Sequence, residues 1–208
     1  MSQESSARTG MAADLHRYLQ ESRESVLASL EGLSEYDIRR PMTPTGTNLL
    51  GLVKHLASGE LGYLGESAGR PFPVPLPWNE DGSVWDGADM WATAEETREE
   101  LVSLYRAAWL HCDQTVDQLG LDAPAHVAWW PEERRETTLG SLLVRVVAET
   151  AHHAGHADVV REMIDGQAGR DHEELGDAAW WASYVERIEQ AASSHRGPTP
   201  AAPSESTT

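Results

Sequence analysis

Apolar residues recur at intervals of three and four residues in long stretches of this chain, and this spacing constrains the fold more than any other feature. Four such segments are present: one spans residues 11–30, one begins near Thr47 and ends before Gly69, one ends near Gly120, and one ends near Gly166. Because each apolar stripe must be buried against another helix, the sequence predicts an all-α protein built as a four-helix bundle. A further amphipathic stretch, residues 178–192, predicts an additional C-terminal helix.

The connections between these helices are long. Residues 70–91 lose the helical spacing and contain several prolines and aromatic residues, which predicts a long ordered loop, and residues 121–137 predict a second loop. Thr93 followed by Glu96 has the spacing of a capping box and predicts the start of the third helix. Thr138 is the predicted N-cap of the fourth helix.

Composition limits the domain organisation and the classes of partner. The 208 residues predict a flexible N-terminus over 1–10, one helical domain over 11–192 and a disordered tail over 193–208. A net charge of −18 excludes a basic surface for nucleic acid. The sequence shows no secretory signal and no run of apolar residues long enough to cross a membrane, so we expect a cytosolic protein.

Residues 149–156 read Glu-Thr-Ala-His-His-Ala-Gly-His, which places one carboxylate and three imidazoles in about two helical turns. At about 100° per residue, all four side chains project from one face of the helix. Imidazole and carboxylate are ordinary ligands of zinc and of non-haem iron, and ligands at i and i+4 can bind one ion. The spacing pairs Glu149 with His153 and His152 with His156. Neither pair completes a site, so a further ligand must come from elsewhere in the chain.

His55 is the best candidate for the missing ligand, because it lies among leucines on the inner face of the second predicted helix. The single cysteine, Cys112, lies among apolar neighbours and is interpreted as a small core residue rather than a nucleophile. The tryptophans of the two loops either wall the mouth of a cavity or anchor the loops to the bundle. These tryptophans are Trp78, Trp85, Trp91, Trp129 and Trp130.

Two sequence blocks carry a family resemblance. These blocks resemble the DinB-like metalloproteins, and most closely their actinobacterial branch, the mycothiol S-transferases. The first block, residues 45–56, reads Thr-Gly-Thr-Asn-Leu-Leu-Gly-Leu-Val-Lys-His-Leu. The second, residues 149–158, reads Glu-Thr-Ala-His-His-Ala-Gly-His-Ala-Asp. The likeness runs from about residue 11 to residue 169. It implies a four-helix bundle of DinB-like type in which one histidine of the second helix and an i, i+4 pair of the fourth bind a divalent metal.

When the chain is aligned on its Ala154-Gly155 step, the resemblance implies that His55, Glu149 and His153 are the metal ligands. Many relatives have His-x-x-x-His in the fourth helix, whereas mycothiol-dependent maleylpyruvate isomerases have Glu-x-x-x-His, as this chain does. Three roles are open for His156: a fourth metal ligand, a hydrogen-bond donor behind the ligands, or a contact to the substrate. His152 is an alternative to Glu149 as a metal ligand. Three further polar residues are predicted to lie near the site. Glu60 either orients a ligand or is solvated. Asp158 and Arg161 are predicted to form a structural pair behind the site.

The resemblance implies a metal-dependent thiol S-transferase, with Zn²⁺ as the favoured metal, Fe²⁺ or Ni²⁺ as alternatives, and mycothiol as co-substrate. The metal-bound thiolate adds to or is transferred to a small electrophile, in detoxification or in a biosynthetic step, and no catalytic residue is assigned beyond the metal centre. The alternatives are a thiol-dependent isomerase of the maleylpyruvate type, a non-catalytic metal-binding stress protein and an iron-dependent oxygenase. The expected partners are the two small molecules and a second subunit in a homodimer, without nucleic acid or membrane.

Overall fold

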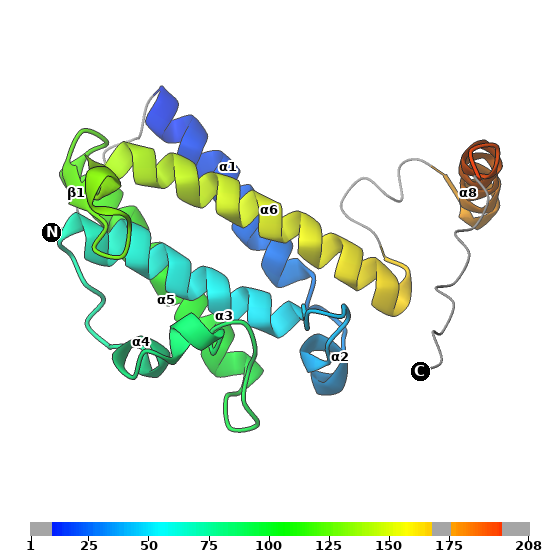
Figure 1. Ribbon diagram of the computed structural model, residues 1–208, viewed down its shortest axis with the longest axis horizontal. Helices are drawn as coiled ribbons and strands as arrows, with labels where there is room; N and C mark the ends of the chain where they lie inside the picture. The colour runs from blue at the N-terminus through cyan, green and yellow to red at the C-terminus, as the bar shows by residue number, and fades with distance from the viewer. Residues whose placement is uncertain (1–9, 168–175, 197–208) are drawn as a thin grey trace, which may run out of the picture. The chain divides into compact units, whose positions relative to one another are not determined.

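Four long helices form the first of two compact units, residues 1–168 and 169–208, into which the chain divides. The computed structural model describes residues 10–167 and 176–196. The long helices are α1 (Met11–Ala28), α3 (Leu49–Glu60), α5 (Arg98–Leu119) and α6 (Leu139–Asp165) (Figure 1). The predicted all-α fold is therefore confirmed. In the second unit, α8 (Ala178–Ser193) is the predicted additional C-terminal helix.

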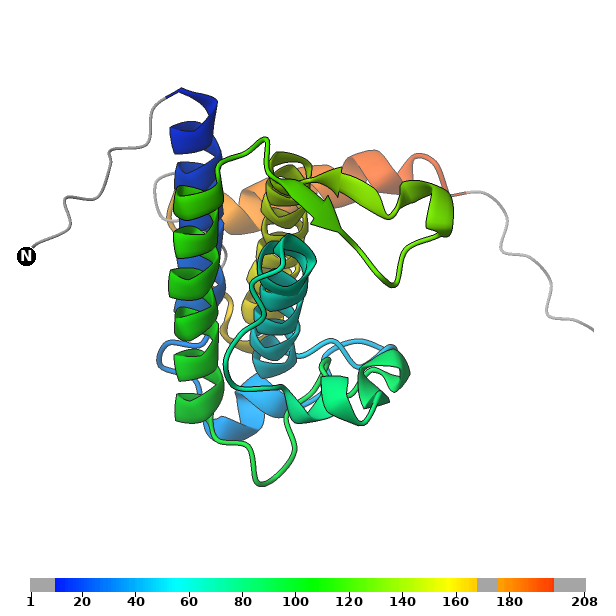
Figure 2. The ribbon, with the colours of Figure 1, turned by 90° about the vertical axis from the view of Figure 1, so that its left-hand side faces the viewer.

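The long helices lie in two layers, α3 with α6 and α1 with α5 (Figures 1 and 2). α1 packs mainly on α6, while α3 packs on α5 and α6. α3 and α6 run in opposite directions, so residues late in one helix lie beside residues early in the other. The two long connections lie on the outer side of the layer formed by α3 and α6 (Figure 2). This layer and its connections are where the polar residues singled out in the sequence are found.

Three of the four long helices, α3, α5 and α6, begin at side-chain caps. The Asn48 side chain accepts a hydrogen bond from the Gly51 backbone at the start of α3, and the Thr138 side chain accepts one from the Ser141 backbone at the start of α6. The predicted cap at Thr138 is confirmed. α6 ends at Gly166, whose φ of 79° is the left-handed conformation that favours glycine at this position.

The predicted start of the third helix at Thr93 is wrong. α5 begins at Arg98, with a complete capping box between Thr97 and Glu100. The Glu96 carboxylate does accept a hydrogen bond from the Thr93 backbone, at 2.7 Å, but it also binds the buried ammonium group of Lys54. Because Glu96 is held by α3 in this way, the turn at Thr93 ends the preceding connection instead of starting a helix.

The connections contain more regular structure than the sequence predicts. After α3 the chain continues through a π-helical turn, η1 (Leu61–Gly65), and a 3₁₀ turn, η2 (Glu66–Ala68), into a connection that holds α4 (Pro77–Glu80) and η3 (Ser83–Asp86). The segment predicted as the second loop instead carries two short antiparallel strands. The remaining elements are α2 (Glu35–Arg39), β1 (Pro124–His126), η4 (Glu132–Arg134) and β2 (Glu136–Thr138). Three-residue strands show no alternation long enough to be recognised in a sequence, which explains the difference.

The interior of the bundle is mostly apolar. Leucines of α1, α3 and α6 are fully buried, among them Leu19, Leu50 and Leu142, and each contributes about 1.5–3 kcal/mol through the loss of its contact with water. Cys112 is fully buried in the same core, as predicted. Among the described residues, no helix is both long enough and apolar enough to cross a membrane.

A charged cluster interrupts this apolar interior. Arg23 of α1 donates two hydrogen bonds to the carboxylate of Glu60 at the end of α3, at 3.0 and 2.6 Å, and a third to Asp113 of α5 at 3.0 Å. Arg23 and Glu60 are 0% and 1% exposed. Two charges removed from water are tolerated only when their hydrogen bonds are made, so the cluster ties three helices together at one position.

The Arg23→Leu variant leaves Glu60 buried without its partner and is expected to lower the free energy of unfolding by about 3–5 kcal/mol. Urea denaturation of the wild type and the variant measures this loss. The matched control is Arg17→Leu on the same helix, where an exposed guanidinium pairs with Glu21 and a much smaller effect is expected. Equal losses in the two variants would contradict the assigned importance of the buried pair.

Candidate metal centre

The structure brings together His55 of α3 with Glu149 and His153 of α6. One ligand atom from each of the three side chains lies within 4.8 Å of the other two. The Oε1 atom of Glu149 is 3.6 Å from Nε2 of His55 and 3.2 Å from Nε2 of His153. Glu149 and His153 meet because they are four residues apart on one helix, and His55 meets them because α3 lies beside α6.

Asp89 holds His55 from the other side of its ring. Nδ1 of His55 donates a hydrogen bond to Oδ2 of Asp89 at 2.7 Å, and the Asp89 side chain is 8% exposed. With the proton on Nδ1, the lone pair of a neutral His55 is on Nε2, the nitrogen that faces Glu149. Carboxylates behind metal-binding histidines commonly fix the ring in this way. Asp89 was not predicted from the sequence, where its only signal was its place among several acidic residues of a long connection.

The connection is ordered because α3 side chains hold it. Asn48 Nδ2 donates to the Met90 carbonyl at 3.1 Å, and Lys54 Nζ donates to the Trp91 carbonyl at the same distance. At Gly51 the backbone of Met90 approaches so closely that a Cβ would lie 1.9 Å from its carbonyl oxygen, so only glycine fits. The two residues that follow Asp89 are therefore fixed to the helix that carries His55.

Trp78 fixes the earlier part of the same connection. Its indole Nε1 donates to the Ser58 hydroxyl at 2.6 Å, and its ring lies 4.2 Å from the Lys54 ammonium. For Trp78 the anchoring interpretation of the loop tryptophans is therefore the right one. Trp85 and Trp91 are more than half exposed.

The pKa values of the clustered side chains shift in different directions. Burial lowers the pKa of His55, but the hydrogen bond and charge of Asp89 outweigh burial, so the pKa of His55 is raised. Burial raises the pKa of Glu149, but the neighbouring histidines, His153 first, bring it below its ordinary value. Burial and the charge of His55 lower the pKa of His153. At neutral pH the cluster thus offers a carboxylate and a neutral imidazole at His153, the protonation states that metal ligands require.

The other polar residues singled out in the sequence lie around this cluster. His152 and His156 are exposed, and Nδ1 of His156 lies 3.4 Å from Nδ1 of His153. Asp158 is half-buried on α6. Arg161 donates to the carbonyls of residues 29 and 31 and pairs with the carboxylate of residue 165, so it fastens the end of α6 to the end of α1. Glu60 is not solvated, because it is the buried partner of the arginine on α1.

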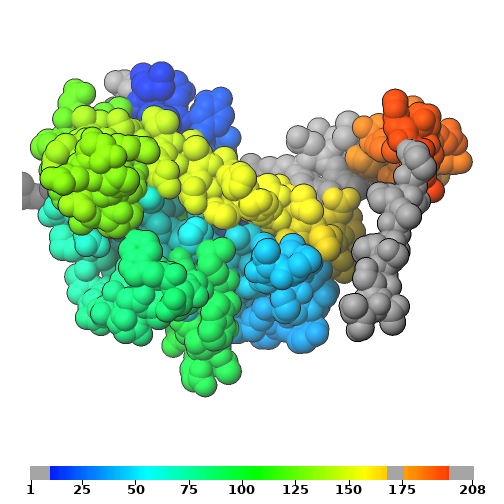
Figure 3. All heavy atoms as spheres, in the orientation of Figure 1, coloured from blue at the N-terminus to red at the C-terminus, as the bar shows by residue number. Residues whose placement is uncertain are grey.

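The three clustered side chains fit a divalent cation. Two imidazoles and one carboxylate are the donors that catalytic zinc and non-haem iron sites use. The side chains of His55, Glu149 and His153 are 25%, 37% and 12% exposed, so the cluster is open to solvent on one side. Figure 3 shows that α6 is uncovered along much of this face of the first unit. A small molecule therefore has access to the metal-binding atoms.

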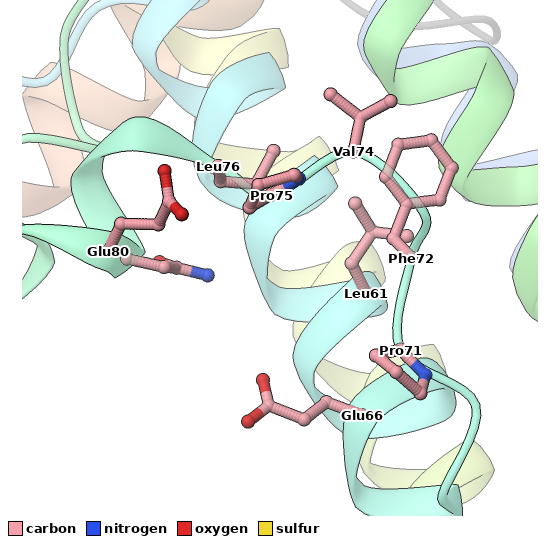
Figure 4. Close-up of a pocket in the computed structure, with 9 residues that line it drawn as sticks. Leu61, Glu66, Pro71, Phe72, Val74, Pro75, Leu76 and Glu80 are labelled. Carbon is pink, nitrogen blue, oxygen red and sulfur yellow. The ribbon is translucent and has the colours of Figure 1, made fainter.

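The hollow in Figure 4 lies between the end of α3 and α4 and has a volume of about 240 Å³. The carboxylates of Glu66 and Glu80 lie on one side of it, and apolar side chains lie on the other (Figure 4). A second hollow, of about 510 Å³, lies at the start of α3 and is lined by Asn48, Met90 and Trp91 among others. None of the three clustered ligands lines either hollow, so the candidate metal centre is a separate, open site.

A bundle whose adjacent helices present two histidines and one glutamate at a single point has the architecture expected of a DinB-like metalloprotein. The Mycothiol-S-transferase family profile matches residues 14–166, and the chain belongs to this family. The predicted resemblance is thus confirmed. A solved structure, described as the conserved protein of locus from Enterococcus faecalis, has a TM-score of 0.59 at 14% identity and covers 77% of this chain and 100% of its own, which shows a shared fold alone. No curated protein matches the chain.

Replacing any of the three clustered ligands by alanine is expected to abolish stoichiometric metal binding, because two remaining donors hold a cation poorly. Elemental analysis of purified wild type, His55→Ala, Glu149→Ala and His153→Ala measures this. His126→Ala is the matched control, because His126 forms a comparable but exposed pair with Glu136. Full metal content in any of the three ligand variants would remove that residue from the site.

Asp89→Asn is expected to weaken metal binding about 10–100-fold without abolishing it, because the asparagine cannot hold the His55 ring as strongly as a carboxylate does. Competition with a chelator of known affinity gives the change in the dissociation constant. Asp86→Asn is the control, since Asp86 is an exposed carboxylate in the same connection. If the two variants bind metal with the same affinity, Asp89 does not orient the ligand.

Proposed function

We propose that this protein is a metal-dependent thiol S-transferase that joins mycothiol to a small electrophile. Membership of the Mycothiol-S-transferase family supports thiol transfer as the general activity. The observation that supports metal dependence is the meeting of His55, Glu149 and His153 within 4.8 Å. Zn²⁺ is the proposed metal, because two neutral imidazoles and one carboxylate form an open catalytic zinc site, and Fe²⁺ and Ni²⁺ are the alternatives.

The residues of the chain prepare this site for chemistry. In neutral His55, Asp89 keeps the proton on Nδ1, and Nε2 is then available as a ligand atom. The lowered pKa values of His153 and Glu149 keep both groups in their metal-binding forms at neutral pH. A divalent cation bound there supplies a Lewis acid that lowers the pKa of an entering thiol, whose thiolate is the nucleophile of the transfer.

The thiol has to come from a co-substrate. Cys112 is 0% exposed, and its Sγ donates to the Glu60 carbonyl at 3.3 Å inside the bundle. Burial raises the pKa of the Cys112 thiol well above its ordinary value, so this side chain stays protonated at neutral pH. A thiol outside the chain is therefore the only source of the nucleophile that the described residues leave for a reaction at the metal centre.

The cellular setting follows from these properties as part of the proposal. The chain acts on small molecules in the cytosol, where it detoxifies reactive electrophiles, and we propose a homodimer as its assembly. The strongly acidic composition, with a net charge of −18, disfavours association with nucleic acid or with an anionic membrane surface. No side chain outside the metal-binding set is proposed as a catalytic residue.

Zinc-loaded wild-type protein incubated with mycothiol and a chromogenic aryl halide is expected to form the thioether conjugate, which mass spectrometry identifies. His55→Ala should reduce the rate to background, because the metal-binding site is lost. Cys112→Ala should retain it, because the nucleophile is the co-substrate.

Two other results would replace the proposal. With maleylpyruvate as substrate, isomerisation with unchanged mycothiol would show a thiol-dependent isomerase. Full zinc content, intact folding and no turnover with either kind of substrate would show a non-catalytic metal-binding protein.

A further inference from the structure

An aromatic and cationic patch lies beside the metal cluster on the same two helical segments. The patch consists of Tyr63 in η1, Trp129 and Trp130 in the segment between β1 and β2, and Arg145 of α6. The guanidinium carbon of Arg145 lies 4.8 Å from the ring centre of Tyr63 and 5.7 Å from that of Trp130. The Tyr63 ring lies 5.4 Å from the ring of Trp129 and 6.0 Å from that of Trp130.

The antiparallel pairing of α3 and α6 determines how far this patch lies from the metal centre. His55 faces His153 across the two helices, and Tyr63 faces Arg145 in the same way. Each pair is eight residues from the other along both segments, which corresponds to about 12 Å of helix. Glu149 lies midway on α6. A small molecule that reacts at the metal centre can therefore reach the patch with its other end.

Arg145 is exposed, and its guanidinium carbon lies over the rings of Tyr63 and Trp130. Among the residues that the structure describes, Arg145 has cation–π contacts with the two aromatic rings, and no carboxylate forms an ion pair with it. A guanidinium stacked on aromatic rings keeps its N–H edges free, and these edges match the two oxygens of a carboxylate. In a chain with 34 acidic and 16 basic residues, such a group provides a local site for an anion.

We propose that Arg145 binds a carboxylate of the electrophilic substrate and that Tyr63, Trp129 and Trp130 contact its planar carbon skeleton. This inference rests on the proposed function, since it assigns a substrate class to that reaction. The electrophile is an unsaturated or aromatic carboxylic acid whose reactive carbon lies at the metal centre. Glu149 does not repel this anion when its charge is neutralised by the bound cation. The acidic hollow beside α4 has two glutamates and no such arginine, which makes it unsuitable for the same ligand.

Binding of a matched pair of probes, cinnamate and the neutral cinnamamide, to zinc-loaded protein tests the proposal without any turnover. Isothermal titration calorimetry is expected to show that Arg145→Gln weakens cinnamate binding about tenfold and leaves cinnamamide binding unchanged. The affinity of Arg145→Lys for cinnamate should lie between those of the wild type and Arg145→Gln, because lysine keeps the charge but lacks the forked geometry. The control is Arg17→Gln, which makes the same change in net charge on α1 and should bind both probes as the wild type does.

Two results would overturn the proposal. Cinnamate binding that is unchanged in Arg145→Gln would show that the carboxylate binds the metal or another surface, and equal weakening of both probes would show that Arg145 only supports the aromatic rings. Failure of the proposed function is distinguishable from both: a protein that loses cinnamate selectivity with Arg145→Gln but never forms a thiol conjugate has the anion site without the transferase reaction.

Discussion

The buried ion pair between Arg23 and Glu60 is the interaction on which the arrangement of the long helices most depends. It joins α1 to the end of α3 and, through Asp113, reaches α5. Charges removed from water cost several kcal/mol each unless every hydrogen bond is made, so a shifted helix would leave one of them unsatisfied. Because Glu60 follows His55 by five residues on α3, the same contact places His55 opposite α6. An interaction inside the core thus positions a candidate metal ligand at its surface.

The connection after α3 provides the second level of organisation. Asn48, Lys54 and Ser58 of α3 bind its backbone or its side chains, and Gly51 allows it to approach the helix closely. Asp89 is thereby carried to the outer side of His55. Loops held on a rigid scaffold commonly carry functional residues, and here the scaffold is the helix that carries the ligand itself. The positions of His55 and Asp89 therefore depend on the same few contacts.

The layer of α3 and α6 concentrates the reactive and recognition groups of the first unit. The cluster of His55, Glu149 and His153 and the Arg145 patch both lie along the line where α6 faces α3 and its continuation η1, about two helical turns apart. The buried ion pair joins this layer to the other one, because Glu60 belongs to α3 and Arg23 to α1. Substitutions in the Arg145 patch can leave the core unaltered, because the patch is built from exposed and half-buried side chains.

Local physics explains what the sequence determined by itself. Helical spacing and the cap at Thr138 act over three or four residues, so the long helices followed directly from the sequence. The same spacing left two i, i+4 pairs open, Glu149 with His153 and His152 with His156, and family resemblance selected the first. His55 was the best candidate for the further ligand because of its place among leucines on the second predicted helix, and family resemblance implied the same residue. Asp89, 34 residues from His55, and the pairing of Arg23 with Glu60, 37 residues apart, depend on how the helices pack. No local period records which distant polar groups meet in a core, because burial and desolvation decide this only once the chain has folded.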